Sequence, residues 1–378
     1  MKLNWFPNPK EYPDNRLFCL DLLRGLDMFY LAIGSVVLRE LLKLNGASPE
    51  TLTFFGGHPW YGFTLYDLIM PLFIFMCGAA IPFALEKRLE NGRAGAAFWK
   101  HVLWRFVMLW VLGMFAQGSL STFDLHHISP YNNTLQTIAF GYLVAAVVML
   151  IRPRWIQIAI PVLLTVAYGL IVHFGGDYTK DGNVTLPFEL KILNSFLPAD
   201  NAQTANISKY GYTWFLPSMM FPVITLAGYF STRILQSALT PWKKAASLAV
   251  YGGGALAVGW LLVPCGVKMV KHIFSVSFTL QAIGWSILLL ALLYVLTDIW
   301  KCRKGTGWLL LFGQFALTAY VLEAIVRGTV TGLWVRFFGG LNRFFPASWG
   351  ALVSAVGYAI VIFVIMILRR RLAQANRK

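Results

Sequence analysis

The feature that most constrains this chain is the recurrence of long stretches that are almost free of charge. Windows of roughly 20 mostly apolar residues follow one another along the whole sequence, and each is long enough to cross a hydrocarbon layer of about 30 Å. Because 57% of the 378 residues are hydrophobic and only 13% are charged, a water-soluble core could not bury them. The sequence therefore predicts a protein whose solvent is lipid.

Ten such windows can be distinguished, and each is expected to be a helix because backbone groups in lipid must be hydrogen-bonded within their own segment. The predicted spans are 17–42, 62–85, 98–118, 132–151, 155–174, 212–235, 245–263, 273–296, 308–330 and 348–368. The predicted fold is all-α: a polytopic integral membrane bundle of about ten transmembrane helices. It is expected to form one transmembrane domain over 1–378, with a long polar extracytoplasmic loop at about 175–211 that suits a lid or a partner surface.

The net charge of +16 is a topology signal, so no nucleic-acid partner is predicted. With the N-terminus inside, the loops on that side carry 20 Lys and Arg residues and the opposite loops carry 10, while Arg24 and Arg105 lie inside spans. Basic residues favour the cytoplasmic side, which predicts an inner-membrane protein with both termini in the cytoplasm. No cleavable signal peptide is recognisable before the first span.

A metal site is not predicted. The four cysteines are scattered without paired spacing, so neither a disulfide framework nor a zinc site is indicated. His58, His126, His127 and His272 are all expected on the outer side, but none of them has the spacing of helical metal ligands.

Ionisable groups inside the spans are costly in lipid and therefore mark candidate sites. Asp21, Arg24 and Asp27 recur at three-residue spacing on the first predicted helix. They either neutralise one another as a structural stripe, or Arg24 attracts the phosphate of an anionic cofactor on the cytoplasmic side. Further cations on that side, which either contact the cofactor or only set the topology, are Lys87, Arg88 and Lys100.

His58 is the outermost candidate on the second predicted span. Because Pro59 suits the first helical position, His58 is expected at the N-cap, where the helix dipole favours a neutral imidazole able to act as base or nucleophile. On a continuous helix, Asp67 would lie roughly 13 Å deeper and on the opposite face. We therefore predict that Asp67 does not orient His58 and that its partner comes from another helix, with Arg105 as a candidate.

Other polar residues fall at helix ends that should face the same compartment as His58. Gln136 lies early in the fourth span, and Lys271 and His272 open the eighth. An interfacial histidine is most often a capping or snorkelling residue, so a functional role for His272 competes with a structural one. Glu323, inside the ninth span, has the same ambiguity.

The string from Gly57 to Gly78 reads G-H-P-W-x-G-x-T-x-x-D-L-x-x-P-x-F-x-F-x-x-G, which closely resembles the heparan-α-glucosaminide N-acetyltransferase family. Residues 16–25 are similar to that family's R-L-x-x-x-D-x-x-R-G opening, beginning at Arg16. Leu135-Gln136 resembles its L-Q-R segment, and residues 271–277 resemble its K-N-L-W-S/T-x-S stretch. Departures from the family pattern, which concern the acceptor more than the fold, are Ser35 and His272 in place of Asn and Thr137 in place of Arg.

The resemblance implies an acetyl-CoA-dependent N-acetyltransferase. It would take acetyl groups from cytosolic acetyl-CoA and transfer them to a terminal glucosamine or related amino sugar, such as the end of a heparan sulfate-like glycan, on the extracytoplasmic side. The family's histidine corresponds to His58, either as acetyl carrier or as base for direct transfer. The expected substrate-binding residues are Trp60, Asp67, Gln136, His272 and Ser275, and the expected cofactor-binding residues are Asp21, Arg24, Lys87, Arg88 and Lys100.

Two other classes stay open at this stage. Ten helices with buried charges also describe a transporter, for example of N-acetylglucosamine, and a related membrane acyltransferase could O-acylate a polysaccharide. The expected partners are an amino-sugar or glycan acceptor, CoA and the lipid bilayer, and a homodimer is a possible assembly.

Overall fold

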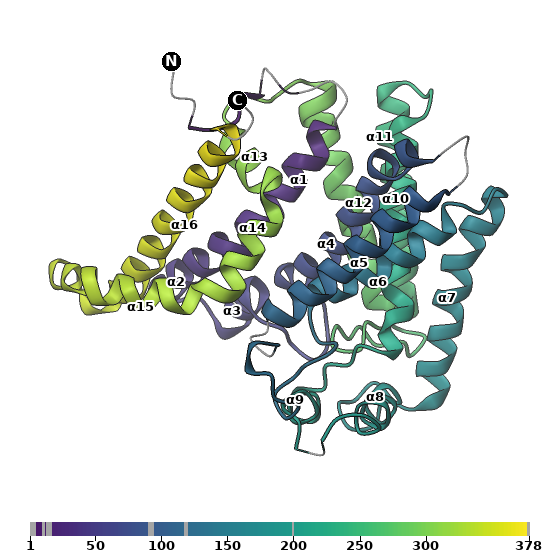
Figure 1. Ribbon diagram of the computed structural model, residues 1–378, viewed down its shortest axis with the longest axis horizontal. Coiled ribbons are helices and arrows are strands. Elements are labelled where there is room, and N and C mark those ends of the chain that lie inside the picture. Colours follow the sequence, from purple (N-terminus) through teal and green to yellow (C-terminus); the bar gives the residue numbers. More distant parts are fainter. Residues whose placement is uncertain are drawn as a thin grey trace. The chain divides into compact units, whose positions relative to one another are not determined.

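The structure of the protein is a computed structural model that describes residues 5–9, 12, 17–89, 94–116, 120–198 and 200–375. Within these ranges all regular secondary structure is helical and no strand occurs, which confirms the predicted helical class (Figure 1). The chain divides into two compact units. Unit 1 comprises Met1–His58, Thr64–Ile69 and Leu292–Lys378, and unit 2 comprises Pro59–Phe63 and Met70–Ala291.

Unit 1 joins the two ends of the chain. Its helices are α1 (Phe18–Phe29), α2 (Ser35–Leu44), α3 (Pro49–Gly56), α13 (Gly307–Gln314), α14 (Ala316–Val321), α15 (Arg327–Phe338) and α16 (Gly350–Ala375). A π-helical turn, Tyr30–Gly34, connects α1 to α2, and another, Leu322–Val326, connects α14 to α15. Helix α1 lies against α13 without space for side chains, because a Cβ on Gly25 would overlap the Leu309 carbonyl and one on Gly313 would overlap the Asp21 carbonyl.

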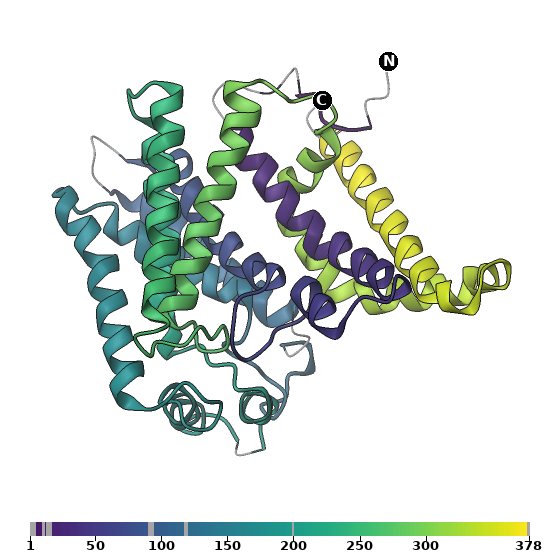
Figure 2. The same cartoon turned by 180° about the vertical axis from the view of Figure 1, so that it is seen from behind.

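Unit 2 is built from the longer central helices. They are α5 (Ala96–Ala116), α6 (Thr134–Val148), α7 (Arg154–Gly175), α8 (Thr185–Leu193), α9 (Ala202–Tyr210), α10 (Met220–Gln236) and α11 (Pro241–Leu262), with most of α4 (Leu65–Ala84) and α12 (Val276–Tyr294). Helices α11 and α12 run side by side, as the view from behind shows (Figure 2), and Gln281 Nε2 of α12 donates to the Leu256 carbonyl of α11 at 2.9 Å.

The predicted number of transmembrane helices is not confirmed. Six helices in the described ranges are long and apolar enough to cross a membrane: Leu65–Arg88, Arg154–Gly175, Pro241–Leu262, Val276–Ile299, Ala316–Phe338 and Gly350–Ala375. Two of the other expected spans form the 15-residue α6 and the 17-residue α10, which at 1.5 Å per residue are only roughly 22 and 26 Å long. The span expected at 17–42 carries Asp21, Arg24 and Asp27, and α5 carries Lys100 and Arg105.

Lipid is nevertheless the solvent that the helices require. In α7 and α11 the most apolar windows are only 17% and 22% buried, although their mean hydropathies are 2.1 and 1.6. Apolar surface of this extent is not left exposed to water in soluble proteins, and its exposure marks contact with a membrane. The protein is therefore a helical membrane protein.

The centre of unit 2 is held by close approach of α4 and α10. A Cβ on Gly78 would overlap the Thr225 carbonyl, and a Cβ on Gly228 would overlap the Phe75 carbonyl, so the two backbones touch at both points. The Thr232 hydroxyl then donates to the Ala79 carbonyl at 2.8 Å. Small residues that let helix backbones meet, with an interhelical hydrogen bond beside them, are the usual basis of helix association in lipid.

Replacing Gly78 with alanine should therefore destabilise the fold. The new methyl group faces a backbone carbonyl of α10 that cannot rotate away, and such overpacking costs about 1–3 kcal/mol. Thermal unfolding of the purified protein in detergent measures the loss. Gly253→Ala is the matched control, because a Cβ at Gly253 of α11 has no neighbour within 4 Å, and equal melting temperatures for the two variants would contradict this packing.

Candidate active site

Helix α4 begins later than the sequence predicted, and this changes the site. Residues 57–64 are non-helical, and the helix starts at Leu65. Thr64 caps it: the Asp67 backbone N–H donates to Thr64 Oγ1 at 3.1 Å, and the Thr64 N–H donates to Asp67 Oδ2 at 3.0 Å. This reciprocal pair is a capping box, with Asp in the place where Glu is usual. The expected N-cap role of His58 is therefore wrong.

His58 and Asp67 are in direct contact, contrary to the prediction. His58 Nδ1 lies 2.6 Å from Asp67 Oδ1, with Asp67 fully buried and the His58 side chain 30% exposed. The prediction failed because it extended the helix back to Pro59. The chain instead turns at Gly62, whose φ of 106° is unfavourable for any residue with a side chain, so His58 returns over the first turn of α4.

Arg105, the candidate partner of Asp67, has other contacts. It belongs to unit 2, where its guanidinium lies 4.6 Å from the centre of the Tyr142 ring and 3.8 Å from Cys77 Sγ.

The backbone before His58 is fixed at two points within unit 1. The Tyr30 hydroxyl, from the π-helical turn after α1, donates to the Phe55 carbonyl at 2.7 Å. The Thr64 hydroxyl lies 3.3 Å from the Gly57 carbonyl. The Tyr66 ring packs against the imidazole, with 4.8 Å between ring centres. The imidazole is thus oriented by its backbone, its ring contact and its carboxylate partner together.

This arrangement determines which atom of His58 can react. A carboxylate accepts hydrogen bonds, so Nδ1 carries the proton and the lone pair of the neutral ring is on Nε2. If Nε2 takes up a proton or an acyl group, the positive charge that develops on the ring lies 2.6 Å from a buried carboxylate. The His58–Asp67 pair therefore has the geometry of an oriented base or nucleophile.

The segment after His58 is anchored in unit 2 through Trp60. Its indole stacks on His272 with 4.7 Å between ring centres, and its Nε1 donates to the Tyr178 carbonyl at 2.9 Å. Tyr212 also packs on His272, at 4.0 Å. The Gly62 N–H donates to the Met269 carbonyl at 2.9 Å. Trp60 and His272, which the sequence named separately as substrate-binding residues, are thus brought into contact.

The loop expected at 175–211 contains two short helices, α8 and α9, at the end of α7 (Figure 1). Besides accepting from Trp60 through Tyr178, it holds the chain that leads into α10. Glu189 of α8 is fully buried, and its Oε2 accepts from the Phe215 N–H at 2.7 Å. Thr213 and Thr185 form a hydroxyl pair at 2.9 Å. The loop is therefore an integral part of unit 2 beside Trp60 and His272.

Gln136 and Ser275 are bonded to their own loops. Gln136 Nε2 donates to the Pro130 carbonyl at 2.6 Å, and its Oε1 accepts from the Asn132 N–H at 3.0 Å. Ser275 Oγ accepts from the Val270 N–H at 3.0 Å. These bonds shape the approaches to α6 and α12, and substrate contact by either side chain stays a prediction.

The predicted cofactor residues lie in both units. In unit 1, Arg24 forms an ion pair with Asp21 at 3.0 Å, and Tyr12 donates to the other Asp21 oxygen at 2.6 Å, so local pairing within that stripe is confirmed for these two charges. In unit 2, the exposed cations at the end of α4 and on α5 are Lys87, Arg88 and Lys100. Arg16, from the opening motif, lies outside the described residues.

Several residues of the site were not identified from the sequence. Thr64 was available, because T-x-x-D directly before an apolar run is a helix-start signature, and it would have placed the helix start at Leu65. Tyr30, Tyr66 and Glu189 had no such signal, since their roles depend on contacts with distant or non-helical segments. Among the described residues, no group of three or more His, Cys, Asp or Glu side chains is placed to hold a metal ion.

Glu189 should make the stability of the protein depend on pH. Its burial raises the pKa of the carboxyl group from 4.5 to about 7. The folded state therefore holds the proton more tightly than the unfolded state, and the stability this contributes below about pH 4.5 is lost as the pH rises through about 7. The change is up to roughly 3 kcal/mol.

Glu189→Gln should remove this slope in melting temperatures measured from pH 4.5 to 8, while Glu50→Gln, at an exposed position on α3, should keep it. Parallel curves for wild type and Glu189→Gln would contradict the assignment.

Comparison with known proteins agrees with the resemblance noted in the sequence over part of the chain. Residues 16–178 match a family model described as "Domain of unknown function (DUF5009)", and this range includes the whole His58–Gly78 string. The chain is also 26% identical over 114 residues to the heparan-alpha-glucosaminide N-acetyltransferase of Mus musculus, a match that covers 30% of this chain and 16% of that relative. These findings support a distant relationship to that enzyme family.

Proposed function

We propose that this protein is a transmembrane acetyltransferase that moves an acetyl group from cytosolic acetyl-CoA to the amino group of a glucosamine or related amino sugar on the extracytoplasmic side. The observation that carries the proposal is the 2.6 Å contact between His58 Nδ1 and the buried Asp67 carboxylate. Ionisable groups are rarely kept in a membrane segment without a function, and an oriented imidazole is the group that acyl transfer to an amine needs. The distant relative supports the same class of reaction.

In the proposed reaction the amine nitrogen forms a bond to the acetyl carbonyl carbon and the thioester C–S bond breaks. The proton lost by the amine passes to His58 Nε2, and the CoA sulfur leaves as thiolate and is protonated in turn. If His58 acts as carrier instead, Nε2 first takes the acetyl group from CoA and then gives it to the amine. In both routes Asp67 holds Nδ1–H and stabilises the positive ring.

The remaining parts of the proposal concern placement and ligands. Acetyl-CoA is the donor, with Arg24, Lys87, Arg88 and Lys100 as candidate contacts for its phosphates, and Trp60 and His272 as candidate contacts for the sugar. In the proposal the protein lies in the inner membrane with both termini in the cytoplasm. The segment of α1 and α2, together with α5, α6 and α10, would complete a single ten-helix domain with the six long apolar helices. A homodimer is compatible with these assignments.

Substitution of His58 by alanine is expected to abolish acetyl transfer to glucosamine in liposomes supplied with acetyl-CoA, because it removes the imidazole that accepts the amine proton. His127→Ala is the matched control, since His127 also contacts a carboxylate, Asp124, at 2.8 Å but is exposed in the 120–128 segment. Wild-type turnover in the His58 variant, with intact melting behaviour, would remove His58 from the mechanism.

Asp67 acts through His58 as a positioning residue, so Asp67→Asn should lower kcat on the order of 100-fold and leave KM for the sugar nearly unchanged. The amide keeps the size of the side chain, but it carries no charge to stabilise the protonated ring. The pH–rate profile separates this role from a structural one: the acidic limb, which reports His58 as a base, should shift in Asp67→Asn. A variant with lower kcat but an unshifted profile would limit Asp67 to capping α4.

The rival class is a carrier for amino sugars. Sealed vesicles that accumulate radiolabelled N-acetylglucosamine without acetyl-CoA would favour it, whereas an acetyltransferase labels glucosamine only when acetyl-CoA is supplied. Analysis of the product at nitrogen and oxygen separates N-acetylation from O-acylation of a polysaccharide.

A further inference from the structure

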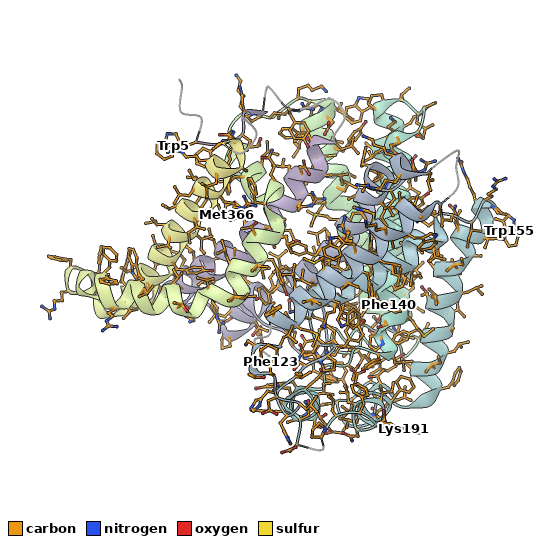
Figure 3. All side chains as sticks on the ribbon, in the orientation of Figure 1. Trp5, Phe123, Phe140, Trp155, Lys191 and Met366 are labelled. Carbon is orange, nitrogen blue, oxygen red and sulfur yellow. The ribbon has the colours of Figure 1, made fainter. Side chains whose placement is uncertain are left out.

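Unit 2 contains a cavity of about 970 Å³ that the proposed function does not use. It lies where α4, α6 and α10 end and α7 and α11 begin, and is lined by Arg152, Arg154, Arg233 and Glu86. The cavity lies at the opposite end of unit 2 from α8. Figure 3 shows this separation, because Trp155 lies in the first turn of α7 and Lys191 of α8 lies past the last turn of α7. The cavity is therefore remote from the Trp60–His272 stack.

The charges at this cavity are unbalanced. Arg233 pairs with Glu86 at 2.9 Å, which accounts for the only acidic side chain among the described lining residues. Arg152 and Arg154 have no acidic partner among the residues that the structure describes. Tyr229 lines the same cavity as these charged residues. An excess of positive charge is left for an anion.

Arg152 and Arg154 are carried on a short connection whose backbone is hydrogen-bonded. They flank Pro153 in the short link between α6 and α7, where Pro153 is the N-cap of α7. Buried Gln157 reaches back across this link, and its Nε2 donates to the Ile151 carbonyl at 2.6 Å and to the Met149 carbonyl at 3.3 Å. These bonds hold the backbone that carries the two arginines at the cavity, and the arginine side chains themselves are exposed.

The rest of the wall combines apolar and aromatic residues with the polar side chains of Gln157, Gln236, Ser237 and Ser247. Ile158, Phe230 and Ile234 line the cavity together with Tyr251 of α11. Basic loops that only set membrane topology need charge but no cavity, whereas a ligand with a phosphate and an apolar part needs both. Arginine is suited to phosphate because its planar group donates two parallel hydrogen bonds.

We infer that this cavity binds the phosphate of an amphipathic anion through Arg152 and Arg154, with the apolar part of the ligand against α7, α10 and α11. Two sources share this chemistry. One is CoA, in which case the inference rests on the proposed function and names where the donor binds. The other is an anionic phospholipid of the surrounding bilayer, and that case is independent of the reaction.

The test uses the full chain and a charge-matched pair of double variants. Arg152→Gln with Arg154→Gln removes the two unpaired charges of the cavity. Lys243→Gln with Lys244→Gln removes two charges from the start of α11, at the same end of unit 2 but outside the cavity lining. Binding of CoA is measured by calorimetry in nanodiscs of phosphatidylcholine, and binding of phosphatidylglycerol by native mass spectrometry in detergent.

The arginine variant should weaken binding of one of the two probes by roughly tenfold or more, and the lysine variant by less than about twofold. Loss of CoA affinity identifies CoA as the ligand, and loss of phosphatidylglycerol binding identifies a lipid. Equal effects of the two variants, or no binding of either probe to the wild type, would overturn the inference.

Acetyl transfer measured on the same samples keeps this outcome separate from the proposed function. If the wild type transfers acetyl groups but the arginine and lysine variants bind both probes equally well, the cavity assignment alone would be wrong. Arginine-dependent lipid binding without any transfer would remove the proposed function alone.

Discussion

The hydrogen bond between His58 and Asp67 is the constraint on which the local structure of the site depends. A carboxylate that is fully buried at the start of an apolar helix must be compensated, because an isolated charge in such surroundings is very unfavourable. Three neighbouring groups stabilise the charge of the Asp67 carboxylate: the His58 ring, the Thr64 N–H and the N-terminus of helix α4. The non-helical segment 57–64, with its turn at Gly62, is the consequence, because only a chain that folds back can bring His58 to this carboxylate.

Side chains on both sides of segment 57–64 hold its backbone in place. Tyr30 holds Phe55 from a π-helical turn, and such turns inside helices are frequent at functional sites. On the other side of His58, Trp60 is fixed in unit 2 by His272 and by the Tyr178 carbonyl. The residues on both sides of His58 are therefore fixed, each within its own unit.

Most of the fold class could be predicted from the sequence, because long apolar windows can only be helices in lipid. Five of the six long apolar helices lie close to their predicted windows, and these windows carry few charges, as in α7 and α16. The windows that failed as long spans are those with internal charges, as in α1, or with helices too short to cross a membrane alone, as α6 and α10. Length and composition cannot predict where the helices of these windows begin and end, because that depends on packing against neighbouring helices.

The residues of the candidate site were named separately from the sequence, which did not predict which of them are in contact. His58, Asp67, Trp60 and His272 were all named, yet the contact between His58 and Asp67 was excluded by placing the helix start at Pro59. The Thr64 capping signal was present in the sequence, but the helix start was inferred from the proline alone. The contact of Trp60 with His272 joins residues far apart in the chain, which no local pattern could reveal.

Mass analysis of the product is the most direct measurement of the central claim. The purified protein would be reconstituted in liposomes with isotopically labelled acetyl-CoA and a panel of amino sugars outside. A labelled acetyl group is expected on the amino nitrogen of at least one sugar. Intact protein that leaves every sugar of the panel unlabelled, or that places the label only on hydroxyl oxygens, would contradict it.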